Sequence, residues 1–334
     1  MNTTRRNFLR FAGLAAGAIG VSGQAAFSAS PAFAAPSVFP PSSGNIFYGA
    51  SEAGTPSLAK YSGKNLGIDR AYYQAASWQS MVSYAAGAAS RGSVPLVSIK
   101  APADWRTMAG GSQDAWIKNI VNGLAAIAGP VCWSIHHEPE NDVNGTSMTA
   151  ATFKAMCGRV ASLHPAPSQS GVWFGPTLMG GKYNQISTPN TSVRQYLKDW
   201  VHPACHAGFF DGYNHWTPGG QAKWRTVPDT FDHMVNGYRD KRTGVSYQGY
   251  KQLLPGKPIV IAEYGVRYDS TGTYDAVAWM ADAYTYATAQ GLAGMSFFSS
   301  NQNVNDGGTA WTLDGARRDE FKKLLLRTTS VLTK

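Results

Sequence analysis

Short apolar segments alternate with longer amphipathic segments along the chain from residue 45 onward. Short apolar runs bounded by turn residues predict buried strands, and apolar positions three or four residues apart predict helices. The predicted strands span residues 45–50, 66–72, 94–100, 131–137, 171–177, 212–216, 258–264 and 292–299, and the clearest helices span 76–90, 114–128, 150–163, 193–202, 274–290 and 316–332. Eight strands alternating with helices predict an α/β fold, a single-domain (β/α)8 TIM barrel.

The first 34 residues have a different pattern. Arg5-Arg6 precede Phe8-Leu9, a glycine-rich apolar run covers residues 11–21, and Ala32-Phe33-Ala34 offers a small-residue cleavage site. This pattern predicts a signal peptide over residues 1–34, and the paired arginines favour the twin-arginine type over an ordinary secretory signal. Residues 35–44 are then a linker and residues 45–334 the (β/α)8 domain. We expect export, to the outside of the cell or to the cell envelope or periplasm.

Composition and charge narrow the class of protein. The chain is 43% hydrophobic and 15% charged, as expected of a globular protein with a substantial core. The net charge of +9 includes three arginines of the signal segment, and no later run of Lys or Arg exceeds two residues, so the sequence does not predict a nucleic-acid partner. After the signal, no apolar stretch is long enough to span a bilayer. No G-x-G-x-x-G motif follows the first strand, which disfavours a dinucleotide-binding sheet.

The three cysteines, Cys132, Cys157 and Cys205, lack the spacing of a metal site. At most one disulfide can form among them, and the sequence leaves open whether any does. Cys132 lies in an apolar strand and is expected to be a buried thiol. The sequence also leaves the oligomeric state open.

Two predicted strands end in a carboxylate. The fourth ends in His136-His137-Glu138, and the seventh contains Glu263 near its end. Ionisable groups at the end of a buried strand are costly unless they pair or take part in chemistry. Two carboxyl groups that meet at the mouth of a barrel suit glycoside hydrolysis, in which one donates a proton and the other attacks. Simple strand alternation predicts that two sets of residues each share one face: Ser134, His136 and Glu138, and Ile259, Ile261 and Glu263.

The motifs His137-Glu138-Pro139 and Ile261-Ala262-Glu263-Tyr264-Gly265 resemble the catalytic motifs of the large clan of retaining (β/α)8 glycoside hydrolases. A His before the first Glu is similar to glycoside hydrolase family 26, the β-mannanase family. The resemblance implies that Glu138 is the acid/base and Glu263 the nucleophile in double displacement of O-glycosidic bonds. It implies a polysaccharide or oligosaccharide substrate, with a β-mannan-like glycan as one candidate, and no cofactor or metal.

The resemblance also implies supporting residues. His137 would touch the sugar or orient Glu138, and Arg70 would lie beside the nucleophile. The clan has a Tyr near the end of strand six that contacts the nucleophile, but the segment Tyr213-Asn214-His215-Trp216 offers no clear counterpart. The usual strand-eight Trp is missing, and Trp311 could fill its place. Glu140 is expected to be a solvated loop acid or a support for Arg70.

Aromatic side chains near strand ends could stack on sugar rings, because the C–H faces of sugars are amphipathic. Trp216 and Trp311 are the preferred candidates, and His215 and Tyr264 complete the predicted substrate-binding set. The full group of stacking candidates is Trp105, Tyr183, Trp216, Trp224, Tyr264 and Trp311.

Other readings remain open at this stage. The two glutamates could be structural, salt-bridged groups. His136 and His137 could bind a metal with His206, Asp211 or His215, which would make the protein a metal-dependent TIM-barrel hydrolase. The first strand lacks the His-x-His that such enzymes usually carry. The third reading is a barrel that binds carbohydrate without cleaving it.

Overall fold

The computed structural model describes residues 39–41, 44–51, 58–183, 195–216, 222–240, 244–269, 271–300 and 311–328. The predicted signal peptide and most of the predicted linker lie outside this part of the chain. The strands are β1 (Phe47–Ser51), β2 (Ile68–Tyr73), β3 (Val94–Ile99), β4 (Val131–Ile135), β5 (Val172–Phe174), β6 (Thr177–Met179), β7 (Gly208–Asn214), β8 (Tyr238–Arg239), β9 (Ser246–Tyr247), β10 (Ile259–Val266) and β11 (Gly294–Phe298).

Nine of these strands form one parallel sheet in the order β5-β4-β3-β2-β1-β11-β10-β7-β6. β5 and β6 are two halves of one barrel strand, separated by Gly175 and Pro176. Gly175 donates its N–H to Trp133 of β4 at 3.2 Å, and Phe209 of β7 donates to Pro176 at 3.0 Å. β4 thus pairs with the first half of this segment and β7 with the second half, so the sheet closes on itself. This closure confirms the predicted TIM-barrel fold, with eight strand positions around the ring.

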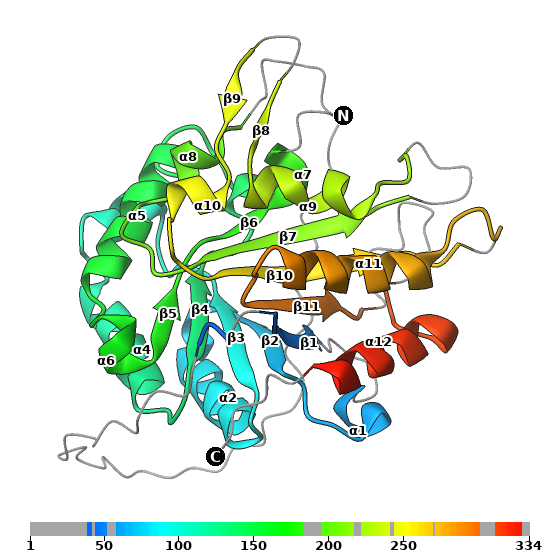
Figure 1. The fold of residues 1–334 in the computed structure, drawn as a ribbon. Coiled ribbons are helices and arrows are strands. Elements are labelled where there is room, and N and C mark those ends of the chain that lie inside the picture. Colours follow the sequence, from blue (N-terminus) through cyan, green and yellow to red (C-terminus); the bar gives the residue numbers. More distant parts are fainter. Residues whose placement is uncertain are drawn as a thin grey trace. The chain divides into compact units, whose positions relative to one another are not determined.

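Helices cover the outside of the sheet (Figure 1). They are α1 (Leu58–Ser62), α2 (Trp78–Ser90), α3 (Trp105–Ala109), α4 (Asp114–Ala125), α5 (Ala150–Ser162), α6 (Pro167–Ser170), α7 (Gly180–Tyr183), α8 (Leu197–Trp200), α9 (Val227–Val235), α10 (Tyr250–Leu253), α11 (Ala276–Ala289) and α12 (Gly315–Arg327), with short 3-10 turns η1 (Ala75–Ser77) and η2 (Pro139–Asn141). The β8–β9 hairpin is an insertion between α9 and β10. No helix in the described part of the chain is long and apolar enough to cross a membrane.

The sixth barrel strand, β7, begins earlier than predicted. The apolar pair Phe209-Phe210 starts the strand after Gly208, and Asp211 follows inside it. An ionisable residue in mid-strand masked this run in the sequence, and the prediction began at Gly212 instead. The correction matters because it brings Asp211 into a barrel strand and moves Tyr213 from the start of that strand to near its end.

Apolar side chains fill the barrel floor. A compact cluster includes Phe47, Ile68, Leu96, Phe209 and Val260 from five different strands. Phe39, inside the predicted linker, packs on Phe47 with ring centroids 5.8 Å apart, so this residue belongs to the folded domain. Cys132 is buried in the same cluster, and burial raises the pKa of its thiol. Cys157 and Cys205 are also buried, and both are free thiols. Burial raises the pKa of Cys157, and a hydrogen bond to Cys205 raises it further.

A β-bulge sets the direction of Glu263. Ile261 pairs with Phe210, and Glu263 pairs with the very next residue, Asp211, so β10 holds one extra residue at this point. Ile261 packs in the outer core and Ala262 in the barrel floor. The predicted shared face of Ile259, Ile261 and Glu263 is therefore wrong. The bulge shifts the alternation and turns Glu263 toward the barrel interior.

The fourth strand also departs from simple alternation. β4 ends at Ile135, and His136 takes a left-handed backbone conformation with φ of 55°. The His136 ring then packs edge-on against Trp105 of α3, with centroids 5.1 Å apart. The predicted common face of Ser134, His136 and Glu138 is broken at His136.

Tyr264 lies on the outer face of β10 and is fully buried in the core between sheet and helices. Its hydroxyl bonds to that of Tyr48 on β1 at 2.6 Å. We expect Tyr264→Phe to lower the free energy of unfolding by about 1–3 kcal/mol, because Tyr48 is left buried without this partner. The double variant Tyr48→Phe/Tyr264→Phe should lose less than the sum of the single variants. Urea unfolding measures both, and strictly additive losses would contradict this interaction.

Candidate active site

Glu263 is held through both carboxylate oxygens. Arg70 of β2 donates to Oε1 at 3.3 Å, and Tyr213 of β7 donates to Oε2 at 2.6 Å. The structure thus brings Arg70 beside Glu263, as the resemblance implied. Tyr213 makes the contact with Glu263 that the resemblance led us to expect of a tyrosine near the end of this strand. Three strands position this group, so the carboxylate has little freedom to turn.

Arg70 is itself fixed from below by a chain of hydroxyl groups. Its guanidinium donates to Ser98, the Ser98 and Ser134 hydroxyls lie 2.7 Å apart, and Thr177 donates to Ser134 at 2.9 Å. These residues come from β3, β4 and β6 and form a polar layer above the apolar floor. The Arg70 guanidinium also lies 4.3 Å from the centre of the Tyr72 ring. A buried cation is tolerable here because the Ser98 hydroxyl and the Glu263 carboxylate accept its hydrogen bonds and the Tyr72 ring covers it.

Glu138 lies in a strained connection between β4 and η2. Glu138 and His136 both have positive φ, 50° and 55°, a conformation that is uncommon for residues with side chains and costs of order 1–3 kcal/mol each. Hydrogen bonds hold the connection in place. His136 bonds to Asp142 at 2.8 Å, Lys100 donates to Asp142 at 3.0 Å, and the Glu138 N–H donates to Thr177 O at 3.0 Å.

The surroundings of Glu138 favour its protonated form. Burial, followed by the negative charges of Glu263 and Glu140, raises the pKa of Glu138 to about 8. Asn141 donates its side-chain N–H to Glu138 Oε2 at 3.2 Å. A carboxyl group that keeps its proton at neutral pH can act as a general acid.

Glu140 does not have the expected place in solvent. It is buried, and its Oε1 accepts hydrogen bonds from Met179 N at 2.9 Å and Tyr183 Oη at 2.7 Å. Burial raises its pKa to about 7 despite these donors. Glu140 therefore anchors η2 to β6 and α7 instead of supporting Arg70.

His137 is partly buried beside the Tyr72 ring, with ring centroids 5.2 Å apart. Burial, together with the charges of Lys100 and Arg70, lowers its pKa well below the usual value. His137 is therefore a neutral side chain at the edge of the Glu138 connection. This position agrees with either of its expected roles, toward a sugar or toward Glu138.

Of the other predicted substrate-binding residues, Trp311 and His215 lie beside Tyr213, whereas Tyr264 lies away from the site. Trp311 packs on Tyr213 with centroids 5.0 Å apart, and His215 meets Trp311 edge-on at 5.6 Å. Gly265 makes room for Trp311, since a Cβ there would lie 2.9 Å from the indole. These residues therefore surround the Tyr213–Glu263 contact. In contrast, Tyr264 is buried on the other face of β10 and does not line the site.

The other stacking candidates are also placed. Trp105 and Tyr183 are buried, so neither offers an open ring face. Trp216 and Trp224 pack with Tyr274, beyond the ends of β7 and β10.

The residues proposed for a metal site have other partners. His136 bonds to Asp142, and the His206 ring packs against His164 with centroids 5.5 Å apart. Within the described ranges, no group of three His, Cys, Asp or Glu side chains is arranged to hold a metal ion.

Asp211 is a buried acid beside the site. The sequence pointed to it only as a possible metal ligand. It is 1% exposed, and neither carboxyl oxygen has a hydrogen-bond partner in the structure. Burial, then the charges of Glu263 and Glu138, raises its pKa well above the usual value, against the opposing effect of Arg70. Its position inside the apolar run of β7 was the signal that could have identified it.

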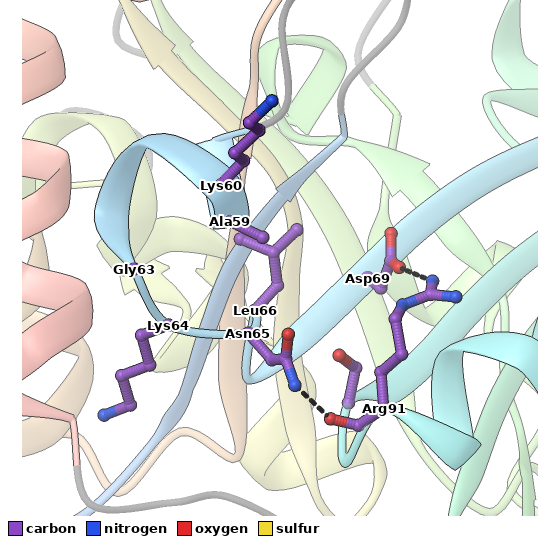
Figure 2. Close-up of a pocket in the computed structure, with 9 residues that line it drawn as sticks. Ala59, Lys60, Gly63, Lys64, Asn65, Leu66, Asp69 and Arg91 are labelled. Carbon is purple, nitrogen blue, oxygen red and sulfur yellow. Dashed lines mark hydrogen bonds and ion pairs between the residues drawn. The ribbon is translucent and has the colours of Figure 1, made fainter.

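A surface cavity of about 590 Å³ lies at the other end of the barrel, near the start of β2 and the end of α2 (Figure 2). Arg91 and Asp69 pair across it at 3.0 Å, and Lys64 donates to the Leu325 carbonyl at 3.0 Å. These charges are already matched by partners within the fold. The cavity therefore offers less to a ligand than the carboxyl end, where several acids surround one buried arginine.

Comparisons with known proteins show the fold. No protein-family model matches the sequence, and no curated protein matches it. The structure is similar to a GH26 β-mannanase from Bacteroides ovatus, with 12% identity, a TM-score of 0.50, and 86% of this chain and 90% of that chain covered. It is similar to fungal β-1,4-galactanases, with 12% identity, a TM-score of 0.54, and coverage of 84% and 94%.

A third similar structure is the endo-1,4-β-D-mannanase from Thermotoga petrophila RKU-1, with 12% identity, a TM-score of 0.51, and coverage of 84% and 99%. The TIM-barrel fold is thus shared with glycoside hydrolases along most of each chain. At such low identity the similarity extends to the fold alone.

The raised pKa of Asp211 has a consequence for stability. The unfolded chain releases this proton near pH 4 and the folded protein only at higher pH, so its effect on stability becomes less favourable as pH rises above about 4. Asp211→Asn carries no such proton. Its stability relative to the native protein should improve by up to about 1.4 kcal/mol per pH unit as pH rises above about 4. Urea titrations at several pH values measure this slope, and a pH-independent difference would contradict it.

Proposed function

We propose that this protein is a retaining glycoside hydrolase that cleaves O-glycosidic bonds in a polysaccharide or oligosaccharide. Glu263 is the nucleophile and Glu138 the acid/base. The observation that carries the proposal is the contrast between the two carboxyl groups. Glu138 keeps its proton near neutral pH, while Arg70 and Tyr213 hold both oxygens of Glu263 in one orientation. A pair of acids with such different surroundings suits a proton donor and a nucleophile.

The reaction proceeds in two displacements. Glu263 attacks the anomeric carbon while the bond to the leaving oxygen breaks, and Glu138 gives its proton to that oxygen. A covalent glycosyl-enzyme remains, and Glu138 is now a carboxylate. Glu138 then takes a proton from water, the water oxygen bonds to the anomeric carbon, and the ester to Glu263 breaks. Both carboxyl groups return to their starting states, so no cofactor is consumed.

The arrangement around Glu263 supports these roles. Tyr213 and Arg70 can stabilise negative charge on Glu263 when it leaves the sugar in the second step. The strain at Glu138 is consistent with a residue fixed for function, because such conformations persist where the surrounding structure over-determines them.

Similarity in fold and the resemblance in motifs support the substrate class that we propose. Structural neighbours are described as β-mannanases and β-1,4-galactanases. We therefore propose a β-linked polysaccharide as the substrate, with a β-mannan-like glycan as the first candidate. Export through the predicted twin-arginine signal would bring the enzyme to such a polymer.

Variants at the two glutamates separate their roles. Glu263→Ala should lower activity by several orders of magnitude with any leaving group, because the nucleophile is lost. Glu138→Ala should form the intermediate readily from an activated aryl β-glycoside but hydrolyse it slowly, since no base activates water. Azide should rescue Glu138→Ala and yield a β-glycosyl azide, whereas rescue of Glu263→Ala should yield the α-anomer. Steady-state rates and NMR of the products measure this.

Asp282→Ala is a matched control, because Asp282 is an exposed carboxylate on α11. It should retain the activity of the native protein. Near-native rates for both glutamate variants on a cleaved glycan would show that the assignment is wrong.

Glu140 should tune the alkaline limit of activity. Its negative charge helps to raise the pKa of Glu138. Glu140→Gln keeps a side-chain oxygen that can accept from Met179 and Tyr183 but removes the charge, so Glu138 should lose its proton at lower pH. The alkaline limb of the kcat/KM profile should move to lower pH, by on the order of one pH unit. A pH–rate series measures the shift, and an unmoved or more alkaline limb would contradict it.

A further inference from the structure

Three aromatic side chains form a cluster beside the barrel mouth. The Trp224 and Tyr274 rings stack with centroids 4.6 Å apart and planes within 2° of each other. Trp216 meets Tyr274 at 4.8 Å and 74°, and meets Trp224 at 5.9 Å and 75°. We call Trp216, Trp224 and Tyr274 the aromatic cluster. It comes from the segments that follow β7 and β10, the strands of Tyr213 and Glu263.

Hydrogen bonds between backbone groups of these segments and the side chains of Asn214 and Asp269 hold the aromatic cluster in position. The Trp216 N–H donates to the Asn214 side chain at 3.3 Å, and Asn214 donates to the carbonyl of Arg225, the residue after Trp224, at 3.0 Å. The Tyr274 N–H donates to Asp269 at 2.7 Å. Each ring is thus tied to a strand end or to a buried acid. A surface held in this way is preorganised for binding.

The aromatic cluster remains accessible although its rings pack on one another. Tyr274 is 37% exposed, and Trp216 and Trp224 are partly exposed. The exposed large hydrophobic residues in the described part of the chain are Val143, Val245, Tyr268, Tyr274 and Leu326. Three of these five follow β4 or β10, the strands that lead to Glu138 and Glu263. Exposed large apolar side chains are therefore most frequent in the segments that follow these two strands.

We propose that the aromatic cluster binds a sugar ring of a polysaccharide chain, remote from the bond that lies between Glu138 and Glu263. This inference rests on the proposed function and extends it to the length of the substrate. Trp216 lies three residues beyond Tyr213 along the chain, a reach of up to ~10 Å. Its ring packs against Tyr274 and Trp224 and not against Tyr213 or Trp311, the rings beside Glu263, so it faces a different sugar from the one that reacts there. The amphipathic face of a pyranose suits a fixed aromatic surface at this distance.

The aromatic cluster therefore contributes to polymers and long oligosaccharides and little to short substrates. An aryl glycoside with one sugar fills the space between the glutamates and does not reach Tyr274. The ratio of kcat/KM on polymer to kcat/KM on aryl glycoside thus reports on the cluster alone. The activity of the reacting centre cancels from that ratio.

The kinetic test compares variants on soluble galactomannan, β-1,4-galactan and carboxymethylcellulose with a nitrophenyl glycoside of the same sugar. Trp216→Ala and Tyr274→Ala should each lower the polymer-to-aryl ratio by roughly three- to tenfold, the amount expected for one aromatic contact. Tyr274→Phe should restore most of it, because the ring remains. Tyr61→Ala removes a partly exposed ring of α1 that packs 4.2 Å from the Arg318 guanidinium, and it should leave the ratio unchanged.

Equal losses on polymer and aryl glycoside, or no loss on either, would overturn the proposal. Tyr274→Ala alone decides the result if Trp216→Ala fails to fold, and circular dichroism verifies folding in each variant.

A binding measurement separates failure of this proposal from failure of the proposed function. The Glu263→Ala protein is run through native gels that contain each of the three polysaccharides. Retardation in one gel that is lost in Glu263→Ala/Tyr274→Ala supports the aromatic cluster as a glycan site, even if the native enzyme cleaves none of them. Absence of retardation in all three gels, or retardation that the Tyr274 change leaves intact, overturns it.

Discussion

One buried cation, Arg70, organises the carboxyl end of this barrel. Its guanidinium is enclosed by β2, β3 and β10, and it reaches Glu263 at 3.3 Å and Ser98 from below. Asp211 and Glu138 lie close enough that their charges interact with it. A buried cation of this kind requires negative partners, while closely placed acids in a dry site cannot all ionise. Burial and the neighbouring negative charges raise the pKa of Glu138 to about 8 and that of Asp211 well above its usual value, while Arg70 opposes both shifts.

The sequence predicted the order of strands and helices well, because each of these elements extends over several residues. Eight apolar runs and the helices between them needed only the correct period and order. Directions of individual side chains depended on local irregularities that no period reveals. The bulge after Ile261 turned Glu263 inward, and left-handed His136 ended β4 early. Both irregularities lie next to the predicted glutamates, where functional demands override regular structure.

The same contrast applies to the site. Glu138 and Glu263 stood out because charged residues at the ends of apolar runs are conspicuous, and the resemblance in motifs implied Arg70. Tyr213 could not be assigned until the start of β7 was known, since the shift of four residues changed its place in the strand. Glu140 was misjudged because the groups that donate hydrogen bonds to it come from distant segments. Its partners, Met179 and Tyr183, are about forty residues away in the sequence, and only the closed barrel brings them together.

Several polar side-chain atoms in and around the site are buried without a hydrogen-bond partner. Asp211 has no partner for either carboxyl oxygen, and Glu140 Oε2, Arg70 Nε and His137 Nδ1 are buried without one in the structure. Each such atom costs on the order of 1–3 kcal/mol, and the strained backbone at Glu138 adds to that cost. A fold selected for stability alone would fill these positions with apolar side chains. Under the proposed function, a substrate rich in hydroxyl groups would complete some of the hydrogen bonds that the protein leaves open beside Arg70 and the two glutamates.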